Sequence, residues 1–466
     1  MTSRIQGIRV GRTLTVASDQ PEPQRDTPTR WVADRVWLGS EQLSPTTAIE
    51  LRDGRFAGIE PGESDEGGMP LGGLVIPGMV NAHSHAFHRL LRGRTHRQGG
   101  DFWLWRERMY EIAEDLTPES YEEIATAVYV EMAMAGITTV GEFHYVHHQP
   151  GGVPYEDPNE MGHALVRAAR RVGIRICLLD VGYFRAGFDD RPLHPYQERF
   201  SDGTVDDWLD RVDLLSSAYD ASDVVIGVAP HSVRAVPFEA LRRVRDRVDE
   251  TVPVHIHVSE QSAENRDCLE ATGMTPTGLL DAAGLLGPMT TLVHATHLEP
   301  ADIETIGGSG SCVCYCATTE RDLADGLGPA SELIEVGAGL SVGTDSHAVI
   351  DIFEETRGVE MHQRLRTGRR GVMNPVTLME AATTAGARSL GFPGLGVSIG
   401  APADFVAIDP VSPRLAGLDP TSVDSIVFAA TAADVTDTFV SGTRVVAQGH
   451  HPEWEVVRDV LTAPRE

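Results

Sequence analysis

The chain contains no lysine, so every basic side chain other than histidine is an arginine. This absence excludes enzymes that form a Schiff base through lysine, including pyridoxal phosphate enzymes, and it excludes the phosphate-binding loop that requires a lysine. It also excludes a metal centre bridged by a carboxylated lysine. Any metal chemistry therefore has to rest on histidine, cysteine or carboxylate ligands.

Long hydrophobic runs and disulfide patterns are missing as well. The longest apolar segments, such as residues 224–229, have the length of a strand and are far too short to span a membrane. The N-terminus lacks the basic and apolar regions of a secretory signal. Five cysteines in 466 residues do not form a disulfide framework. We therefore expect a cytoplasmic protein in which Cys312, Cys314 and Cys316 lie on one face of a buried strand as small hydrophobic residues.

Acidic residues greatly outnumber basic ones, which gives a formal net charge of −29. A negative field repels phosphates, so we expect neither nucleic acids nor anionic membranes as partners. A small substrate is not excluded, because it responds to the charges that line its own pocket.

Strands alternate with helices through the middle of the chain. A helix is predicted from Thr117-Pro118 to about Ala135, because this pair is a typical helix start and an apolar stripe follows it. Eight strands followed by helices favour a (β/α)8 TIM-like barrel, whose functional residues lie at the carboxyl ends of the strands. A doubly wound open sheet is the alternative, but no glycine-rich phosphate motif accompanies any strand. The eight predicted strands are residues 74–83, 137–143, 175–182, 224–229, 252–257, 290–295, 311–317 and 340–344.

Short β segments flank this region on both sides. Residues 31–59 contain strands with a hairpin signal at Asp53-Gly54, and residues 19–28 are expected to form a loop. Further strands are predicted at residues 405–408, 425–428, 437–440 and 443–446. We expect the two flanking regions to pair into one small β-sandwich. The resulting division is 1–77 for an arm and part of the sandwich, 78–397 for the barrel, and 398–466 for the rest of the sandwich.

Polar residues stand at the ends of several predicted barrel strands. His83 and His85 end the first strand and point the same way, because side chains alternate along a strand. His257, His294 and Asp345 end the fifth, sixth and eighth strands. Taken singly, each histidine could be an ordinary buried histidine and the aspartate a turn residue. A barrel, however, brings the carboxyl ends of its strands around one cavity. The set therefore favours a metal site. His144, His147 and His148 leave open a second metal site or a polar rim, and we favour the rim.

Several motifs around these residues are long enough to identify a family resemblance. The chain resembles the amidohydrolase superfamily, in its mononuclear deaminase-like branch, over nearly its whole length. It is more closely similar to the formimidoylglutamate deiminases of histidine breakdown. The motifs that carry this resemblance are HSHAFHR at 83–89, FWLWRE at 102–107, EFHYVHH at 142–148, APHSVR at 229–234, VHIHVSEQ at 254–261 and TTERDLADG at 318–326.

This resemblance implies specific roles for individual residues. It implies one divalent metal ion, with zinc the first choice and iron or manganese as alternatives, and a homodimer. Glu260 resembles the family's proton shuttle, and His294 its second catalytic histidine. Asp345 is both ligand and base. The implied metal ligands are His83, His85, His257 and Asp345, and the implied substrate-binding residues are His88, Arg106, Tyr145, His231 and Arg234. His88 is a departure, because the family usually has glutamine at this position.

The expected substrate is N-formimino-L-glutamate, a small amidine with two carboxylates. Its expected products are N-formyl-L-glutamate and ammonia. Two arginines suit the carboxylates, because guanidinium forms paired charge-assisted bonds. The alternatives are a mononuclear deaminase that acts on a purine or pyrimidine ring, and a non-catalytic barrel retained as a scaffold. The complete ligand set argues against the scaffold.

Overall fold

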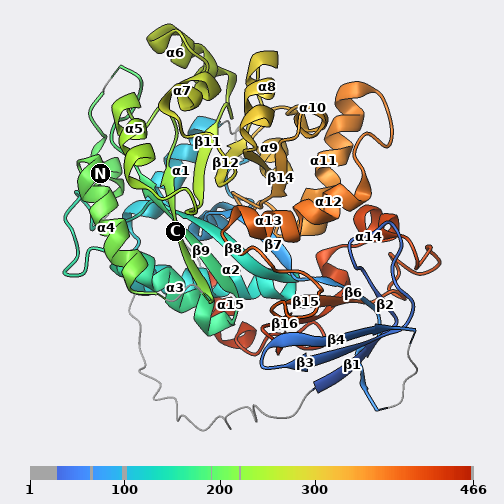
Figure 1. Cartoon of the computed structure of the whole chain (residues 1–466). Helices are drawn as coiled ribbons and strands as arrows, with labels where there is room; N and C mark the ends of the chain where they lie inside the picture. Colours follow the sequence, from blue (N-terminus) through green and yellow to red (C-terminus); the bar gives the residue numbers. More distant parts are fainter. Residues whose placement is uncertain (1–28, 63–66, 97–101, 190, 220–221, 463–466) are drawn as a thin grey trace.

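The computed structural model describes residues 29–62, 67–96, 102–189, 191–219 and 222–462 of the chain. Eight parallel strands form one sheet in chain order, and helices surround it (Figure 1). This sheet confirms the predicted (β/α)8 barrel over the open doubly wound alternative. The loop expected at residues 19–28 lies outside the described residues. The barrel strands are β7 (Met79–Ser84), β8 (Ile137–His144), β9 (Arg175–Gly182), β10 (Val224–Pro230), β11 (Val254–Val258), β12 (Thr290–His294), β13 (Cys312–Tyr315) and β14 (Gly339–Val342).

The barrel closes where the chain after β14 reaches β7. The backbone N–H groups of Thr344 and Asp345 donate to the carbonyl of His83, at 3.1 and 3.0 Å. The N–H of His85 donates to the carbonyl of Asp345 at 3.3 Å. A Cβ on Gly343 would lie 2.7 Å from the backbone nitrogen of His83, so this approach requires glycine. Closure therefore sets two predicted metal ligands, His85 and Asp345, on adjoining backbones.

Helices cover the outside of the barrel, and α2 shows how the sequence starts one. The Thr117 side chain accepts a hydrogen bond from the N–H of Ser120, and Pro118 occupies the first turn, where no N–H is needed. This confirms the predicted helix. No described helix is long and apolar enough to cross a membrane. The helices are α1 (Phe102–Glu114), α2 (Pro118–Met134), α3 (Glu160–Val172), α4 (Val205–Ser217), α5 (Phe238–Arg247), α6 (Ser262–Thr272), α7 (Pro276–Ala283), α8 (Pro300–Ser309), α9 (Ala317–Asp322), α10 (Ala330–Glu335), α11 (Ile352–Thr367), α12 (Pro375–Ala381), α13 (Thr384–Ser389), α14 (Val423–Ala429) and α15 (Trp454–Thr462), with 3-10 turns η1 (Ala86–Leu91), η2 (Pro195–Phe200) and η3 (Ala432–Asp434).

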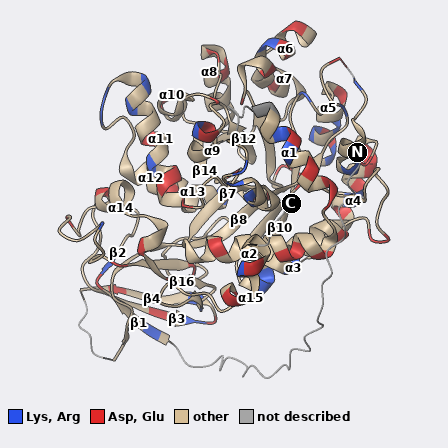
Figure 2. Cartoon of the chain, turned by 180° about the vertical axis from the view of Figure 1, so that it is seen from behind, with Lys and Arg blue, Asp and Glu red and all other residues tan. Residues whose placement is uncertain are grey.

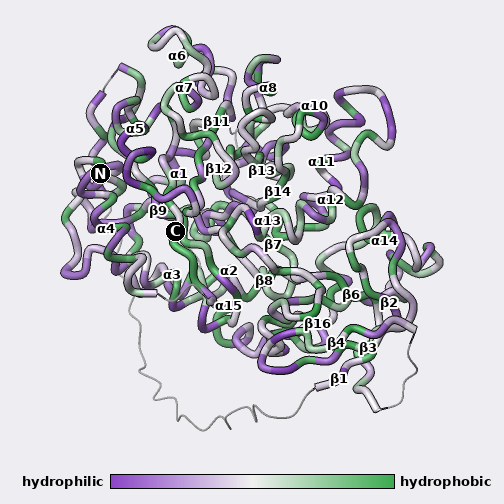
Figure 3. Tube along the Cα trace, in the orientation of Figure 1, coloured by the Kyte–Doolittle hydropathy of each residue, from purple (hydrophilic) through white to green (hydrophobic). Residues whose placement is uncertain are grey.

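Charge and hydropathy follow this layered arrangement. Acidic and basic residues are spread along the outer helices (Figure 2). Hydrophobic stretches follow the strands, and hydrophilic ones are concentrated in the outer loops (Figure 3). Barrel strands such as β8 and β9 are buried along their whole length, as expected for a parallel sheet that helices cover.

Two small sheets lie side by side below the barrel in Figure 1. Asp53 and Gly54 both have positive φ, 51° and 72°, and join β3 to β4 in the predicted hairpin. A shared hydrophobic core, which includes Phe56, Phe405 and Phe439, lies between the sheets. The second sheet combines strands from both ends of the chain, as predicted. The first sheet contains β1 (Thr29–Ala33), β3 (Thr47–Arg52), β4 (Arg55–Pro61) and β5 (Met69–Pro70), and the second contains β2 (Arg35–Val36), β6 (Leu74–Pro77), β15 (Phe405–Ile408), β16 (Val435–Val440) and β17 (Thr443–Val446).

Two predicted strands are wrong in detail. Residues 74–83 are not one strand, because the chain leaves β6 in the small sheet and enters β7 in the barrel around Gly78. The apolar run is continuous there, so hydrophobicity alone does not show the change of sheet. Residues 425–428 are part of helix α14, whose first turn is capped by Ser422. A short apolar run fits either a strand or a buried helix, and here the cap decides.

A buried ion pair ties the barrel to the second small sheet. The guanidinium of Arg175, at the start of β9, donates to the two carboxylate oxygens of Asp404 at 2.6 and 3.1 Å. It also donates to the hydroxyl of Ser441 at 2.6 Å. Because both charged side chains are almost fully buried, loss of either partner would leave an uncompensated charge between the two parts.

Candidate metal centre and substrate cavity

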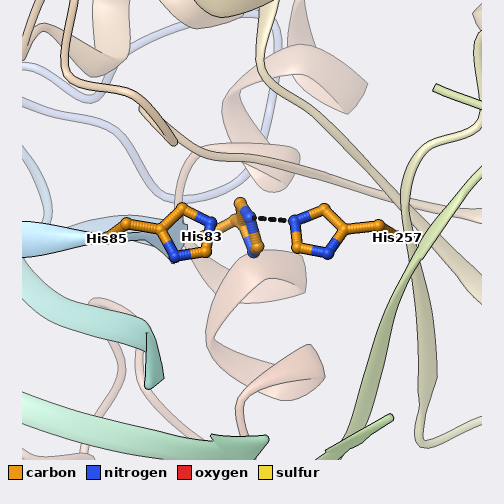
Figure 4. Close-up of side chains that lie close together, drawn as sticks. All are labelled: His83, His85 and His257. Atoms are coloured by element: carbon orange, nitrogen blue, oxygen red, sulfur yellow. Dashed lines mark hydrogen bonds between the residues drawn. The ribbon is translucent and has the colours of Figure 1, made fainter. Parts of the chain in front are cut away.

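Three histidines and an aspartate converge at the carboxyl ends of β7, β11 and β14. Nε2 of His83 lies 3.1 Å from Nε2 of His257. Oδ1 of Asp345 lies 3.3 Å from Nε2 of His85 and 3.6 Å from Nε2 of His83. All four side chains are buried, and Figure 4 shows the three imidazole rings facing one another. The structure thus brings together the four residues predicted as metal ligands.

Backbone carbonyls fix how two of these rings point. Nδ1 of His85 lies 3.0 Å from the carbonyl of Phe143, and Nδ1 of His257 lies 3.0 Å from the carbonyl of His231. A carbonyl only accepts hydrogen bonds, so each Nδ1 carries the proton and each Nε2 lone pair faces the centre. Burial lowers the pKa of His83 to about 3 and holds that of His257 well below its usual value. Neutral imidazoles with inward lone pairs are what a divalent metal requires.

A buried carboxylate holds the backbone on both sides of His85. The hydroxyl of Ser84 and the N–H of Ala86 each donate to Glu142 at 2.6 Å. Burial raises the pKa of Glu142 to about 7, although these two hydrogen bonds act in the opposite direction. Glu142 therefore restrains His85 from the neighbouring strand β8.

Unusual backbone conformations are concentrated around the same centre. Five residues other than glycine have positive φ at the ends of β11, β12 and β14. Such conformations cost about 1–3 kcal/mol each and persist only where surrounding structure holds them. The unusual backbone directs side chains such as His294 and Asp345 toward the centre, whereas a regular strand end would direct them differently. The residues are Ser259 (52°), His294 (70°), Ala295 (47°), Asp345 (41°) and His347 (56°).

His294 lies between the predicted ligand Asp345 and two glutamates. Its Nε2 is 3.8 Å from Oδ2 of Asp345 and 3.9 Å from Oε1 of Glu260, and its Nδ1 is 3.6 Å from Oε1 of Glu320. Burial alone would lower the pKa of His294, but the three carboxylates raise it well above its usual value. The surrounding carboxylates therefore favour the protonated form of this ring. Glu320 belongs to the TTERDLADG motif, but the sequence assigned it no role.

A cavity opens onto this centre and is lined by ten of the eleven predicted site residues. The exception is His83, whose side chain is fully buried. The residues predicted to bind the metal, to catalyse the reaction and to bind the substrate thus border one cavity, although they come from distant parts of the chain. The sequence-predicted residues that line the cavity are His85, His88, Arg106, Tyr145, His231, Arg234, His257, Glu260, His294 and Asp345.

His88 and Tyr145 contact each other at the cavity wall. Nε2 of His88 lies 2.7 Å from the hydroxyl of Tyr145, which donates to Sδ of Met109 at 3.3 Å. Burial lowers the pKa of His88 well below its usual value. A neutral His88 can therefore donate through Nε2 to the Tyr145 oxygen, a contact that a glutamine amide could also make.

Two arginines bring positive charge to the cavity wall. Arg106, on α1, donates from Nε to the hydroxyl of Tyr110 at 2.9 Å. Arg234 follows β10, and nearby Glu264 on α6 raises its pKa. Burial raises the pKa of Glu264 to about 7, in spite of Arg234. Glu264 and Glu260 both raise the pKa of Arg234, so the guanidinium keeps its positive charge at the cavity wall.

Sequence reasoning missed several residues that line the cavity. Tyr110 follows Arg106 by one helical turn, a spacing that could have predicted their contact. Trp105 and Leu323 fall within motifs already recognised, but without a role. Tyr183 and the residues of η2 lie in loops after β9, where no local pattern marks them. The missed cavity residues are Trp105, Met109, Tyr110, Tyr183, Phe200 and Leu323.

A second group of possible ligands, His144, His147 and Asp180, lies away from the cavity. The polar rim expected for this histidine-rich segment is wrong, because the side chains are buried. Arg211 donates to both oxygens of Asp180 at 2.8 Å, and Trp208 donates to Oδ1 at the same distance. The carboxylate is therefore already neutralised and hydrogen-bonded, which disfavours a metal ion at this position.

Comparisons of the sequence and of the structure with known proteins identify related enzymes. The sequence profile of the Amidohydrolase family matches residues 74–445. The formimidoylglutamate deiminase of Pseudomonas aeruginosa is 38% identical over 410 residues, covering 86% of this chain and 90% of the relative. A 5-methylthioadenosine/S-adenosylhomocysteine deaminase of Haloarcula marismortui is 28% identical, covering 88% and 92%. The crystal structure of an amidohydrolase from Brucella melitensis superposes with a TM-score of 0.84 at 31% identity, covering 93% and 98%.

Proposed function

The chain belongs to the amidohydrolase family, and from this premise we propose that it is a metal-dependent deiminase that hydrolyses N-formimino-L-glutamate to N-formyl-L-glutamate and ammonia. One observation carries the proposal. Arg106, on helix α1 after β7, and Arg234, on the loop after β10, line the same cavity as the histidine–aspartate centre. A substrate with an amidine at one end and two carboxylates toward the other matches this division of charge.

The side chains at the centre fit a divalent ion. His83, His85, His257 and Asp345 would hold it, because their ligand atoms converge and two rings have inward Nε2 lone pairs. Three imidazoles and one carboxylate suit zinc, and iron or manganese are alternatives. When bound, the ion supplies Lewis acidity, which lets water ionise near neutral pH.

The neighbouring groups would then move protons and stabilise charge. Asp345 accepts a proton from the water that attacks the amidine carbon. His294, whose Nε2 faces Asp345 and Glu260, donates to negative charge that develops there. Glu260 delivers a proton to the leaving nitrogen, so that the C–N bond breaks with release of ammonia. One water is consumed, and the amidine becomes a formamide.

The other end of the cavity would hold the carboxylates. Arg106, Arg234 and His231 line it from α1 and from the loop after β10. The Tyr145 ring lies 5.4 Å from the His85 ring and 6.2 Å from the His231 ring, and its hydrogen bond with His88 fixes the hydroxyl. Charge-assisted bonds to arginine would orient the substrate with its amidine toward Asp345 and Glu260.

A ring deaminase is the second candidate. Trp105, Phe200 and Tyr183 line the cavity, and aromatic side chains can stack on a planar base. The direct test is ammonia release from purified enzyme with N-formimino-L-glutamate, alongside 5-methylthioadenosine, guanine and cytosine. We expect turnover of the first compound and little of the others. Efficient turnover of a ring compound alone would overturn the proposal.

Metal analysis provides an independent test. We expect one equivalent of zinc, iron or manganese per chain, and loss of activity on chelation that is restored by adding the ion back. Two tightly held ions, both needed for activity, would contradict a mononuclear centre. The same proposal includes a role in histidine degradation, a cytoplasmic location, a homodimer and the domain division at residues 77/78 and 397/398. Sedimentation of the purified protein tests the dimer.

A further inference from the structure

A buried glutamine, Gln197, joins two tyrosines at the arginine end of the cavity. It lies in η2 and is fully buried. Its Oε1 accepts from the backbone N–H of His194 at 3.0 Å. Because a backbone N–H only donates, this contact fixes which end of the amide is oxygen and which is nitrogen. The Nε2 group therefore points at Tyr110 and Tyr183, and it donates to each hydroxyl at 3.0 Å.

The hydrogen bonds accepted by Tyr110 leave it no free lone pair. Its hydroxyl oxygen accepts from Nε2 of Gln197 and from Nε of Arg106, at 3.0 and 2.9 Å. A phenol oxygen accepts about two hydrogen bonds and donates one. The O–H of Tyr110 must therefore be donated elsewhere, and the Tyr183 hydroxyl cannot donate to Tyr110.

Either arrangement leaves a phenol proton for the cavity. If Tyr110 donates into the cavity, Tyr183 has to do the same. If Tyr110 donates to Tyr183 instead, the Tyr183 oxygen accepts two hydrogen bonds, from Gln197 and from Tyr110. The O–H of Tyr183 is then the proton left for the cavity. Among the described residues, no carboxylate or carbonyl accepts from either phenol. Both rings line the cavity beside Arg106 and Arg234.

We propose that Tyr110 and Tyr183, oriented by Gln197, form a donor pair for a substrate carboxylate and help to set the requirement for a dicarboxylate. The inference rests on the proposed function, since it names a further part of the same substrate site. An acceptor is needed because each arrangement leaves at least one phenol proton for the cavity. A negative one is favoured because both arginines adjoin the pair. Burial also raises the pKa of Tyr183, so its hydroxyl keeps its proton at neutral pH.

The test removes the hydroxyls and compares substrates. For Tyr110→Phe/Tyr183→Phe, kcat/KM with N-formimino-L-glutamate should fall about 10- to 100-fold, the scale of hydrogen bonds to a charged group. The loss should come mainly through KM. N-formimino-4-aminobutanoate and N-formimino-L-norvaline each lack one carboxylate. For the compound that lacks the carboxylate bound by the pair, kcat/KM should fall less than about 3-fold in the double variant. Tyr219→Phe is the matched control, because its hydroxyl contacts His163 outside the cavity.

Further measurements separate folding and function from the donor role. Thermal unfolding and metal content should match the wild type. If the double variant does not fold, Tyr183→Phe and Gln197→Leu take its place. Wild-type kinetics in the double variant, or equal losses on all three substrates, would overturn the donor pair. Calorimetry with glutarate provides a readout without turnover. If the double variant binds glutarate more weakly and the wild type does not turn over N-formimino-L-glutamate, the carboxylate subsite is supported. That result would overturn only the proposed deimination. A wild type that neither binds glutarate nor turns over would overturn both.

Discussion

Two buried clusters of histidine and aspartate lie in neighbouring parts of this barrel, and they differ in what balances the carboxylate. The open cluster is His83, His85, His257 and Asp345, and it borders the cavity. The arginine cluster is His144, His147, Asp180 and Arg211. In the arginine cluster a guanidinium donates to both oxygens of Asp180. Among the described residues, the ion-pair partners of Asp345 are all histidines.

The contrast shows why histidine spacing alone does not identify a metal site. Both clusters place three ligand atoms within 4.8 Å of one another. In the arginine cluster the positive charge comes from the chain itself, and Trp208 and Asn159 complete its hydrogen bonds. In the open cluster no described arginine pairs with Asp345, and two imidazoles direct their Nε2 lone pairs inward. The lack of a guanidinium partner, together with access from the cavity, distinguishes a binding site from a structural ion pair.

The largest effect should follow from removing the cation of the arginine cluster. Arg211→Met leaves Asp180 and Asp202 buried without their partner, so the free energy of unfolding should fall by about 3–5 kcal/mol. Denaturant unfolding measures this change. Metal content of the folded fraction should stay the same, because Arg211 lies outside the cavity. Unchanged stability would mean that the arginine cluster is not a structural ion pair.

Glu260→Gln is the corresponding change beside the open cluster. The amide keeps the size of the side chain but cannot deliver a proton, so kcat should fall by at least about 10²-fold, or about 2.7 kcal/mol. Stability and metal content should be retained. Steady-state kinetics and elemental analysis measure both, with Glu304→Gln on α8 as a surface control. Near-normal turnover would place the proton shuttle elsewhere.

Arg234→Met tests whether the positive charge of Arg234 binds the substrate. A buried charged contact that loses one partner typically costs about 2–5 kcal/mol, so kcat/KM should fall by roughly 30-fold or more. Exposed Arg243, which pairs with Asp206, gives the matched control Arg243→Met. A substrate that lacks one carboxylate should show a smaller additional loss in the variant. Equal losses on all substrates would indicate a folding defect instead.

The smallest effect concerns the pH dependence of stability. Burial alone would raise the pKa of Asp202, but hydrogen bonds from His148 and Arg211 hold it well below its usual value. The depressed pKa stabilises the fold above the unfolded pKa of about 3.9, and this contribution is lost as the pH falls. Between pH 5 and pH 3 the loss is about 1 kcal/mol. Asp202→Asn should therefore show a shallower decline in unfolding free energy, while exposed Asp281→Asn should follow the wild type.

Elements with a local signature can be predicted from short stretches of the sequence. Side-chain alternation placed His83 and His85 on one side of β7, Thr117-Pro118 started α2, and Asp53-Gly54 formed the hairpin. The strand ends predicted a metal site, and the family resemblance supplied its ligands and the substrate residues. The hairpin, the helix start and the side-chain alternation depend on neighbours within a few positions, so their patterns are visible in one stretch of chain.

Features built from distant segments become visible only in the folded chain. The separation of β6 from β7 depends on which sheet each backbone meets. The pairing of Arg211 with Asp180 joins α4 to β9, and Gln197 joins α1 to the loop after β9. The strained backbone at His294 and Asp345 is likewise held by packing from other strands. Periodicity shows which face of an element is buried, but it does not show which partner is buried against it, because that choice depends on how the whole barrel closes.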